Sequence, residues 1–204
     1  MRSHESSPST DEMLLESLRR GETGAFERLA ERYSDRIFGF GLKMCGERED
    51  ALDVLQDTLL QAFRSIDKIE HAAALRSWLF RVASNACLMK RRKGKYEPAR
   101  ELSLEELAPR NAEEARIEIP DPSTLPDAGV ERAEIRRRLR EAIQQLPQHY
   151  RVVLVLRDLE QMSSKQVGDV LDLPESTVKM RLHRARLMLR KQLAQYYSRE
   201  SDAV

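Results

Sequence analysis

The chain has 204 residues, of which 34% are charged and 5% aromatic, with 8 glycines, 8 prolines and a formal net charge of +1. This composition is typical of a helical protein and argues against a sheet-rich one. No run approaches about 18 uncharged apolar residues, so a transmembrane helix is excluded, and residues 1–11 lack the apolar stretch of a secretory signal. We therefore expect a cytoplasmic protein.

The small net charge hides an uneven distribution along the chain. Residues 76–100 are strongly basic, residues 101–131 are strongly acidic, and residues 132–204 are basic again. Two basic segments separated by an acidic one predict two surfaces for a polyanion. For a basic segment alone a solvated face is the favoured interpretation, so the charge indicates a site only in a structural context.

Helical periodicity dominates the first half of the chain. Apolar residues recur at steps of three and four. The expected helices cover residues 11–20, 25–45, about 49–65 and 77–93, with residues 67–76 as a loop and Ser77 as a cap. On the third helix one side carries apolar residues and another carries acids. The apolar side holds Leu52, Leu55, Leu59, Ala62 and Phe63, and the acidic side holds Asp50, Asp53 and Asp57.

Residues 94–130 have the composition of a linker. They contain five prolines and many acidic residues, without a sustained apolar stripe. Helical spacing resumes at Val130 and stops before Pro147. The apolar run 152–156 could be a buried strand, because periodicity cannot decide over so short a run. No partner strand is visible nearby, so we predict a buried helix.

Residues 163–192 have the pattern of a helix-turn-helix. A serine can cap the first helix, Pro174 can close the turn, and the second helix has six basic residues and no acidic one between Lys179 and Lys191. A cationic second helix fits the major groove, where Arg and Lys contact phosphates and guanine edges. The alternative is a helical hairpin with a solvated basic face. The turn, spacing and charge together favour DNA binding.

Three stretches resemble one known family. Residues 166–186 read QVGDVLDLPESTVKMRLHRAR and look like the C-terminal domain of bacterial sigma-70-type factors, best matching the extracytoplasmic-function (ECF) group. Residues 49–58, EDALDVLQDT, resemble the helix of that family that binds core polymerase. Residues 77–87, SWLFRVASNAC, resemble its helix for the promoter −10 element. The stretches occur in the family's order, which makes the resemblance specific.

Periodicity and resemblance together predict an all-α fold. Two small helical domains are joined by a long, acidic, proline-containing linker, and the C-terminal domain carries the helix-turn-helix. The expected parts are a disordered tail at 1–11, a region 2 domain at 12–93, a flexible linker at 94–130, a region 4 domain at 131–196 and a tail at 197–204. The implied function is that of a sigma factor, which binds core RNA polymerase, directs promoter-specific initiation and assists promoter melting.

The resemblance assigns a partner to each group of polar residues. Core polymerase is expected to contact Asp50, Asp53, Gln56 and Asp57. The −10 element is expected to contact Asn85, Arg81, Lys90, Arg91, Arg92 and Lys93. The −35 element is expected to contact Ser176, Thr177, Lys179, Met180, Arg181, His183, Arg184 and Arg186.

Within these groups the residue types indicate different roles. Asn85 suits hydrogen bonds to base edges. Lys179, His183 and Arg184 are expected in the major groove, whereas Arg181 and Arg186, nearer the buried side of the helix, suit phosphates. The family usually has serine where this chain has Met180. Trp78, spaced with apolar residues, is expected in the core rather than as a stacking platform.

Other chemistry finds little support in the sequence. The chain shows no P-loop, paired carboxylates or nucleophile arrangement, and its four histidines lack ligand spacing, so we expect no enzymatic activity, metal, cofactor or small-molecule substrate. Cys45 and Cys87 can be buried thiols or a redox pair, which the sequence leaves open. The family implies an anti-sigma factor that holds the protein inactive. The alternative function is a stand-alone helix-turn-helix regulator, which would bind its DNA site without polymerase.

Overall fold

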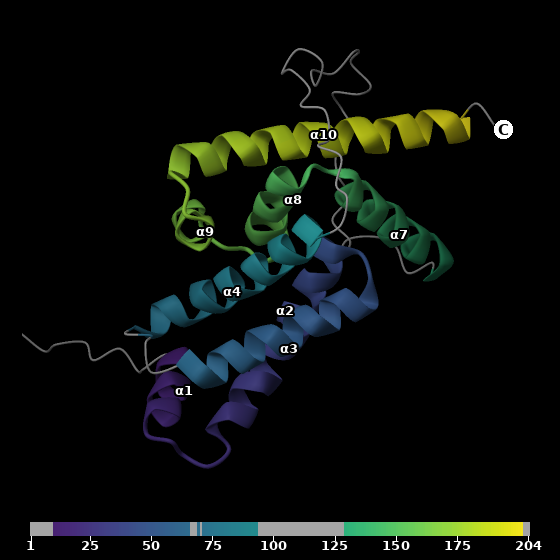
Figure 1. Cartoon of the computed structure of the whole chain (residues 1–204). Helices are drawn as coiled ribbons and strands as arrows, with labels where there is room; N and C mark the ends of the chain where they lie inside the picture. Colours follow the sequence, from purple (N-terminus) through teal and green to yellow (C-terminus); the bar gives the residue numbers. More distant parts are fainter. Residues whose placement is uncertain (1–9, 66–68, 70, 94–128, 202–204) are drawn as a thin grey trace, which may run out of the picture. The chain divides into compact units, whose positions relative to one another are not determined.

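The computed structural model describes residues 10–65, 69, 71–93 and 129–201, and these residues form helices and no strand (Figure 1). The all-α prediction is confirmed. The chain divides into two compact units. The first contains α1 (Thr10–Arg19), α2 (Ala25–Cys45), α3 (Arg48–Ser65) and α4 (Ala72–Lys93). The second contains α7 (Gly129–Gln145), α8 (Gln148–Leu154), the π-helix η2 (Val155–Leu159), most of α9 (Ser164–Leu171) and α10 (Glu175–Ser201). The expected linker lies almost entirely outside the described residues.

The core of the first unit is formed mainly by α2, α3 and α4. The predicted range of α2 is confirmed, and its stripe of Leu29, Ile37 and Phe40 is fully buried. Phe40 meets Phe80 of α4 edge to face, with ring centroids 5.5 Å apart, a favoured aromatic geometry. These contacts fix the distance between α2 and α4 at the centre of the unit.

The helix α1 is attached to α2 by a polar contact. The Tyr33 hydroxyl donates a hydrogen bond of 2.9 Å to Asp11 Oδ2, and Arg32 Nε donates one of 2.7 Å to Asp11 Oδ1. Burial, reinforced by the Asp11 carboxylate, raises the pKa of the Tyr33 phenol to about 12. Tyr33 therefore stays a neutral donor under ordinary conditions.

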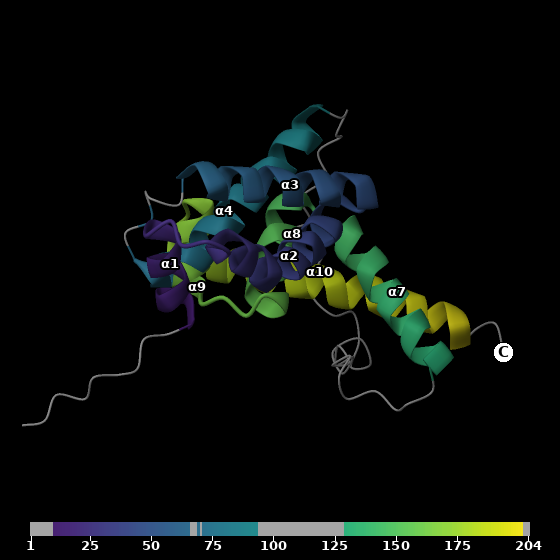
Figure 2. The ribbon, with the colours of Figure 1, turned by 90° about the horizontal axis from the view of Figure 1, so that it is seen from below.

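Small side chains allow α3 to approach α2 closely, and the two helices lie side by side (Figures 1 and 2). The buried side of α3 consists of Ala51, Val54, Thr58 and Ala62. A Cβ atom at Gly41 of α2 would lie 3.1 Å from Ala51 Cα and 3.3 Å from its carbonyl oxygen. The large apolar residues of α3 are consequently on its other sides.

The start of α4 corrects one prediction. The helix begins at Ala72, so residues 72–76, expected in a loop, are helical, and Ser77 lies inside the helix instead of capping it. Alanines have the highest helix propensity, and Leu75 is fully buried four residues before Leu79. The start of the helix is therefore stabilised by packing, and it does not use the side-chain cap that was expected at Ser77.

The second unit is centred on the apolar run 152–156. All five residues are buried in α8 and η2, which confirms a buried helix over a strand. Arg151 is also fully buried, and it donates hydrogen bonds to Gln144 Oε1 at 2.9 Å and to the Leu146 carbonyl at 2.8 Å. These bonds tie α8 to the end of α7.

The long helix α10 packs along α8 and α7 (Figure 1). It continues to Ser201, so residues 197–201, expected in a C-terminal tail, are helical. No glycine or proline follows Leu193 to stop it.

The close approach of α2 and α3 yields a stability prediction. We expect Gly41→Ala to lower the free energy of unfolding by about 1 kcal/mol, because overpacking against the Ala51 backbone outweighs the gain in helix propensity. Urea unfolding followed by the fluorescence of Trp78, the one tryptophan in the chain, reports on this unit. Gly39→Ala is the matched control, since its Cβ would meet only Lys43 Nζ at 3.6 Å. Equal stabilisation by both substitutions would contradict the close contact.

Candidate nucleic-acid interface

The helix-turn-helix predicted from the sequence is present as α9, a short turn and α10. Ser163 and Gln166 form a reciprocal capping box: Gln166 N donates to Ser163 Oγ at 3.1 Å, and Ser163 N donates to Gln166 Oε1 at 2.8 Å. Asp172 turns the chain with a φ of 54°, and Leu173 N then donates to the Gly168 carbonyl at 3.0 Å. A Cβ at Gly168 would lie 2.7 Å from the Leu173 carbonyl oxygen, so only glycine fits this turn.

The exposed face of α10 carries most of the predicted −35 contacts. Val178, Leu182, Ala185 and Leu189 are buried as expected. The exposed members of the predicted set are Ser176, Lys179, Met180, His183 and Arg186, and the half-buried members are Thr177, Arg181 and Arg184. Arg184, which the sequence predicted on the groove face, is thus half-buried. Arg186, which it predicted nearer the buried side, is exposed. The two arginines exchange their predicted positions.

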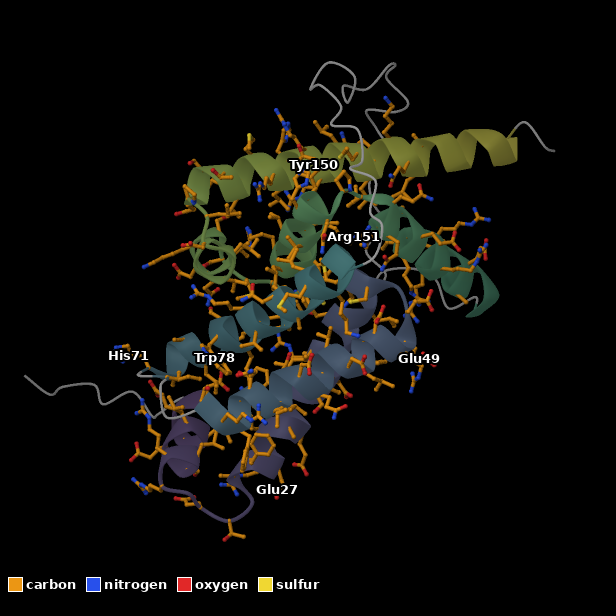
Figure 3. All side chains as sticks on the ribbon, viewed as in Figure 1. Glu27, Glu49, His71, Trp78, Tyr150 and Arg151 are labelled. Carbon is orange, nitrogen blue, oxygen red and sulfur yellow. The ribbon has the colours of Figure 1, made fainter. Side chains whose placement is uncertain are left out.

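Contacts with other helices of the second unit explain that exchange. Arg184 Nη1 donates a hydrogen bond of 3.2 Å to the hydroxyl of Tyr150, which is labelled in Figure 3. Arg186 forms a bidentate pair with Asp158 at 2.6 and 2.9 Å, and this pair raises the pKa of the guanidinium. Lys179 pairs with Glu175 at 2.9 Å and lowers the pKa of that carboxyl. The recognition surface is therefore cationic, with two of its charges already partnered within the unit.

Two of the six predicted −10 contacts, Arg81 and Asn85, lie along one exposed face of α4. Arg81, Asn85 and Met89 are exposed at steps of four, and Trp78, one turn earlier, is half-buried. Arg81 and Asn85 are therefore exposed on the helix that also carries Trp78, which Figure 3 labels. The side chains of Arg91, Arg92 and Lys93 lie outside the described residues.

Lys90 faces α3 rather than continuing that exposed face. Its ammonium lies 2.6 Å from Asp53 Oδ2 and 2.9 Å from Asp50 Oδ1, so one predicted −10 residue pairs with two predicted polymerase contacts. The hydrogen bonds to Asp53 and then Asp50 raise the pKa of Lys90. Gln56 and Asp57 are exposed on α3.

An apolar groove of about 500 Å³ adjoins these acids, and it was not predicted from the sequence. It is lined by Phe26, Leu52, Leu55, Gln56, Leu59, Leu60 and Phe63. Phe63 is 67% exposed, Leu52 43% and Leu60 42%. The sequence places these residues on one side of α3 but does not show that this side is outside. Their exposure marks a surface for a partner.

Two other kinds of site, a membrane span and a metal-binding cluster, are absent from the described part of the chain. No helix there has the length and apolarity needed to cross a membrane. Nor do His, Cys, Asp or Glu side chains gather there in groups of three or more that could hold a metal ion.

Comparison with known families matches both units. Residues 29–96 match the family model for Sigma-70 region 2, and residues 136–189 match that for Sigma-70, region 4. The ECF RNA polymerase sigma factor SigW of Bacillus subtilis is 31% identical to this chain over 182 residues, which cover 88% of this chain and 94% of SigW.

Solved structures show the same fold. The structure of CnrH in complex with the cytosolic domain of CnrY matches with a TM-score of 0.65 and 22% identity, over 92% of this chain and 99% of that one. The sigma factor RpoE in complex with the anti-sigma factor NepR from Bartonella quintana matches with a TM-score of 0.61 and 19% identity, over 84% of this chain and 98% of that one.

The Lys90 cluster yields a prediction about stability and salt. We expect Lys90→Gln to lower the free energy of unfolding by about 0.5–1 kcal/mol at low ionic strength, and by less at high salt. Because the pKa of Lys90 is raised, its contribution is complete at neutral pH and is lost only as the pH rises above the ordinary lysine range. Urea unfolding followed by Trp78 fluorescence measures both dependences.

The control for this substitution is Arg64→Gln, which removes an exposed positive charge from α3. It should change the free energy of unfolding by less than about 0.5 kcal/mol. A loss for Lys90→Gln that salt leaves unchanged would contradict an ionic contribution.

Proposed function

The chain belongs to the sigma-70 family, among its ECF sigma factors, and we propose from this membership that it binds bacterial core RNA polymerase and directs promoter-specific initiation. The observation that carries the proposal is that matches to regions 2 and 4 occur on one chain, each with an exposed face that internal packing does not use. We assign region 2 to residues 12–93 and region 4 to residues 131–196.

The polymerase would dock on α3. Gln56 and Asp57 lie three and four residues after Asp53, and Leu60 lies three residues after Asp57, so acids and apolar residues form one continuous surface. The acids would orient a basic partner during encounter. Burying Leu52, Leu60 and Phe63, each about half-exposed, contributes roughly 1 kcal/mol per side chain.

The −10 element would bind along α4. Asn85 can donate and accept hydrogen bonds at a base edge, and Arg81 can contact a phosphate. A base extruded from the duplex loses a few kcal/mol of stacking, which contacts of this kind offset. Lys90 would orient Asp50 and Asp53 in the free protein, and we assign the phosphate contacts at the end of α4 to Arg91, Arg92 and Lys93.

The −35 element would receive α10 in its major groove. Lys179, Met180 and His183 are exposed at the N-terminal part of the helix, the part that reaches base edges in helix-turn-helix proteins. Arg186 is as exposed as these residues, which suits a phosphate contact. Ser176 and Thr177 would contact the backbone at the helix start, with Arg181 and Arg184 on the flank.

Regulation and location follow from the same proposal. RpoE, a structural neighbour, was solved with an anti-sigma factor, and we propose that a protein of this kind holds the present chain inactive. Acting on polymerase and DNA places the protein in the cytoplasm. The family consists of transcription initiation factors, and we assign the chain no catalytic step of its own.

Run-off transcription with purified core polymerase tests the function. We expect discrete transcripts with core enzyme plus this protein, and none with either alone. Leu60→Gln should raise the protein concentration needed for half-maximal transcription about fivefold, because a polar group replaces an apolar contact worth roughly 1 kcal/mol. Met13→Gln is the matched control, since Met13 is 52% exposed on α1, away from the groove on α3.

Two outcomes would count against the proposal. A specific DNA footprint without core polymerase would support a stand-alone regulator instead. Equal effects of Leu60→Gln and Met13→Gln would show that the groove is not part of the surface that binds polymerase. The proposed function would then be decided by the transcription result alone.

Substitutions in α10 separate base contacts from phosphate contacts. We expect Arg186→Ala to weaken binding of the reconstituted polymerase to all promoters alike and to reduce the slope of log affinity against log salt by about 1. His183→Ala should instead weaken binding about tenfold at the preferred −35 sequence and little at scrambled ones. Filter binding over a salt series measures both. A uniform loss for His183→Ala would contradict its role in reading bases.

A further inference from the structure

The first unit contains a pair of thiols in contact. Cys45 is the last residue of α2 and Cys87 lies within α4, 42 residues later in the chain. Their Sγ atoms are 3.4 Å apart, and neither residue is in a disulfide bond. They are the only two cysteines of the chain. A disulfide bond has an S–S distance of about 2.05 Å, so a small approach would join them.

The two thiols differ in their exposure, and this difference determines which of them reacts first. Cys45 is partly exposed, whereas Cys87 is fully buried. Cys45 is followed by Gly46, whose φ of 90° ends α2 and begins the turn to α3. A thiol at a helix end beside a glycine can move without unpacking a helix interior. An external reagent can therefore reach Cys45 first, and Cys87 lies ready to react with it.

We propose that Cys45 and Cys87 form a reversible disulfide by exchange with a low-molecular-weight disulfide such as oxidised glutathione. The Cys45 thiolate attacks one sulfur of the reagent, forms a mixed disulfide and releases one reduced thiol. The Cys87 thiolate then attacks the Cys45 sulfur and releases the second. The two protein thiols are oxidised, the reagent is reduced to two thiols, and their protons are carried by these products.

The disulfide would connect α2 to α4 and stabilise the folded first unit. It ties the end of α2 to α4 one turn before Lys90, the residue whose ion pairs join α4 to α3. The closed loop contains all of α3 and the part of α4 from Ala72 to Cys87. Closing a loop of this length restricts the unfolded chain and stabilises the folded unit. The proposal does not depend on the assigned function.

The test equilibrates the full-length protein with oxidised and reduced glutathione, followed by acid quenching and alkylation of the remaining thiols. Intact mass without reductant should show a monomer that lacks both alkyl groups, and dithiothreitol should restore them. Because the chain has only these cysteines, that mass identifies the pair. Oxidation should also raise the Tm reported by Trp78 by roughly 10 °C.

Single substitutions provide the controls. Cys45→Ser and Cys87→Ala should each abolish the internal disulfide, and Cys87→Ala should accumulate the mixed disulfide at Cys45. The proposal is overturned if the wild-type protein keeps both thiols, stops at the mixed disulfide or a dimer, or forms the internal disulfide only in urea. A fall in Tm on oxidation would likewise overturn it, since the folded unit would then not accommodate the bond.

Discussion

The close approach of α2 and α3 determines what the first unit can present to a partner. Gly41 and Ala51 leave no room for a larger side chain between the helices, so α3 turns its small residues inward. Its large apolar residues, Leu52, Leu60 and Phe63, must then lie outside. A unit of this size gains stability by burying such residues, and their exposure is therefore costly unless another protein covers them. Packing at one glycine thus exposes the apolar groove that we propose as the docking surface.

Charge in both units is partly neutralised before any partner binds. Lys90 joins α4 to the acids of α3, and Arg186 is paired with Asp158. Exposed pairs of this kind contribute little to stability, so a phosphate or a basic partner can replace one member at small cost. The pairs hold the side chains in place in the free protein. When a partner binds, one ion pair within the protein is then replaced by an ion pair with the partner.

The sequence predicts the helices well and the orientation of some side chains poorly. The ends of α2 follow from periodicity and Gly46, because its one apolar stripe can face only the core. The helix α3 has apolar residues on two sides, and periodicity cannot tell which side is buried. The start of α4 was missed because packing of Leu75, without a cap, begins the helix. On α10 the positions of Arg184 and Arg186 depend on residues of α8 and η2, which are distant in sequence.

The two kinds of surface respond to different properties of the solvent. The groove on α3 is mainly apolar, and the free energy of burying it scales with area and depends little on ionic strength. On the proposed assignment the exposed face of α10 binds DNA through cations, and its affinity would fall steeply with salt because counterions are released from DNA. Under that proposal one chain combines a salt-tolerant attachment to its protein partner with a salt-sensitive reading of DNA. The protein can remain attached while its contacts with DNA form and break, which is what a specificity subunit must do as it moves between sequences.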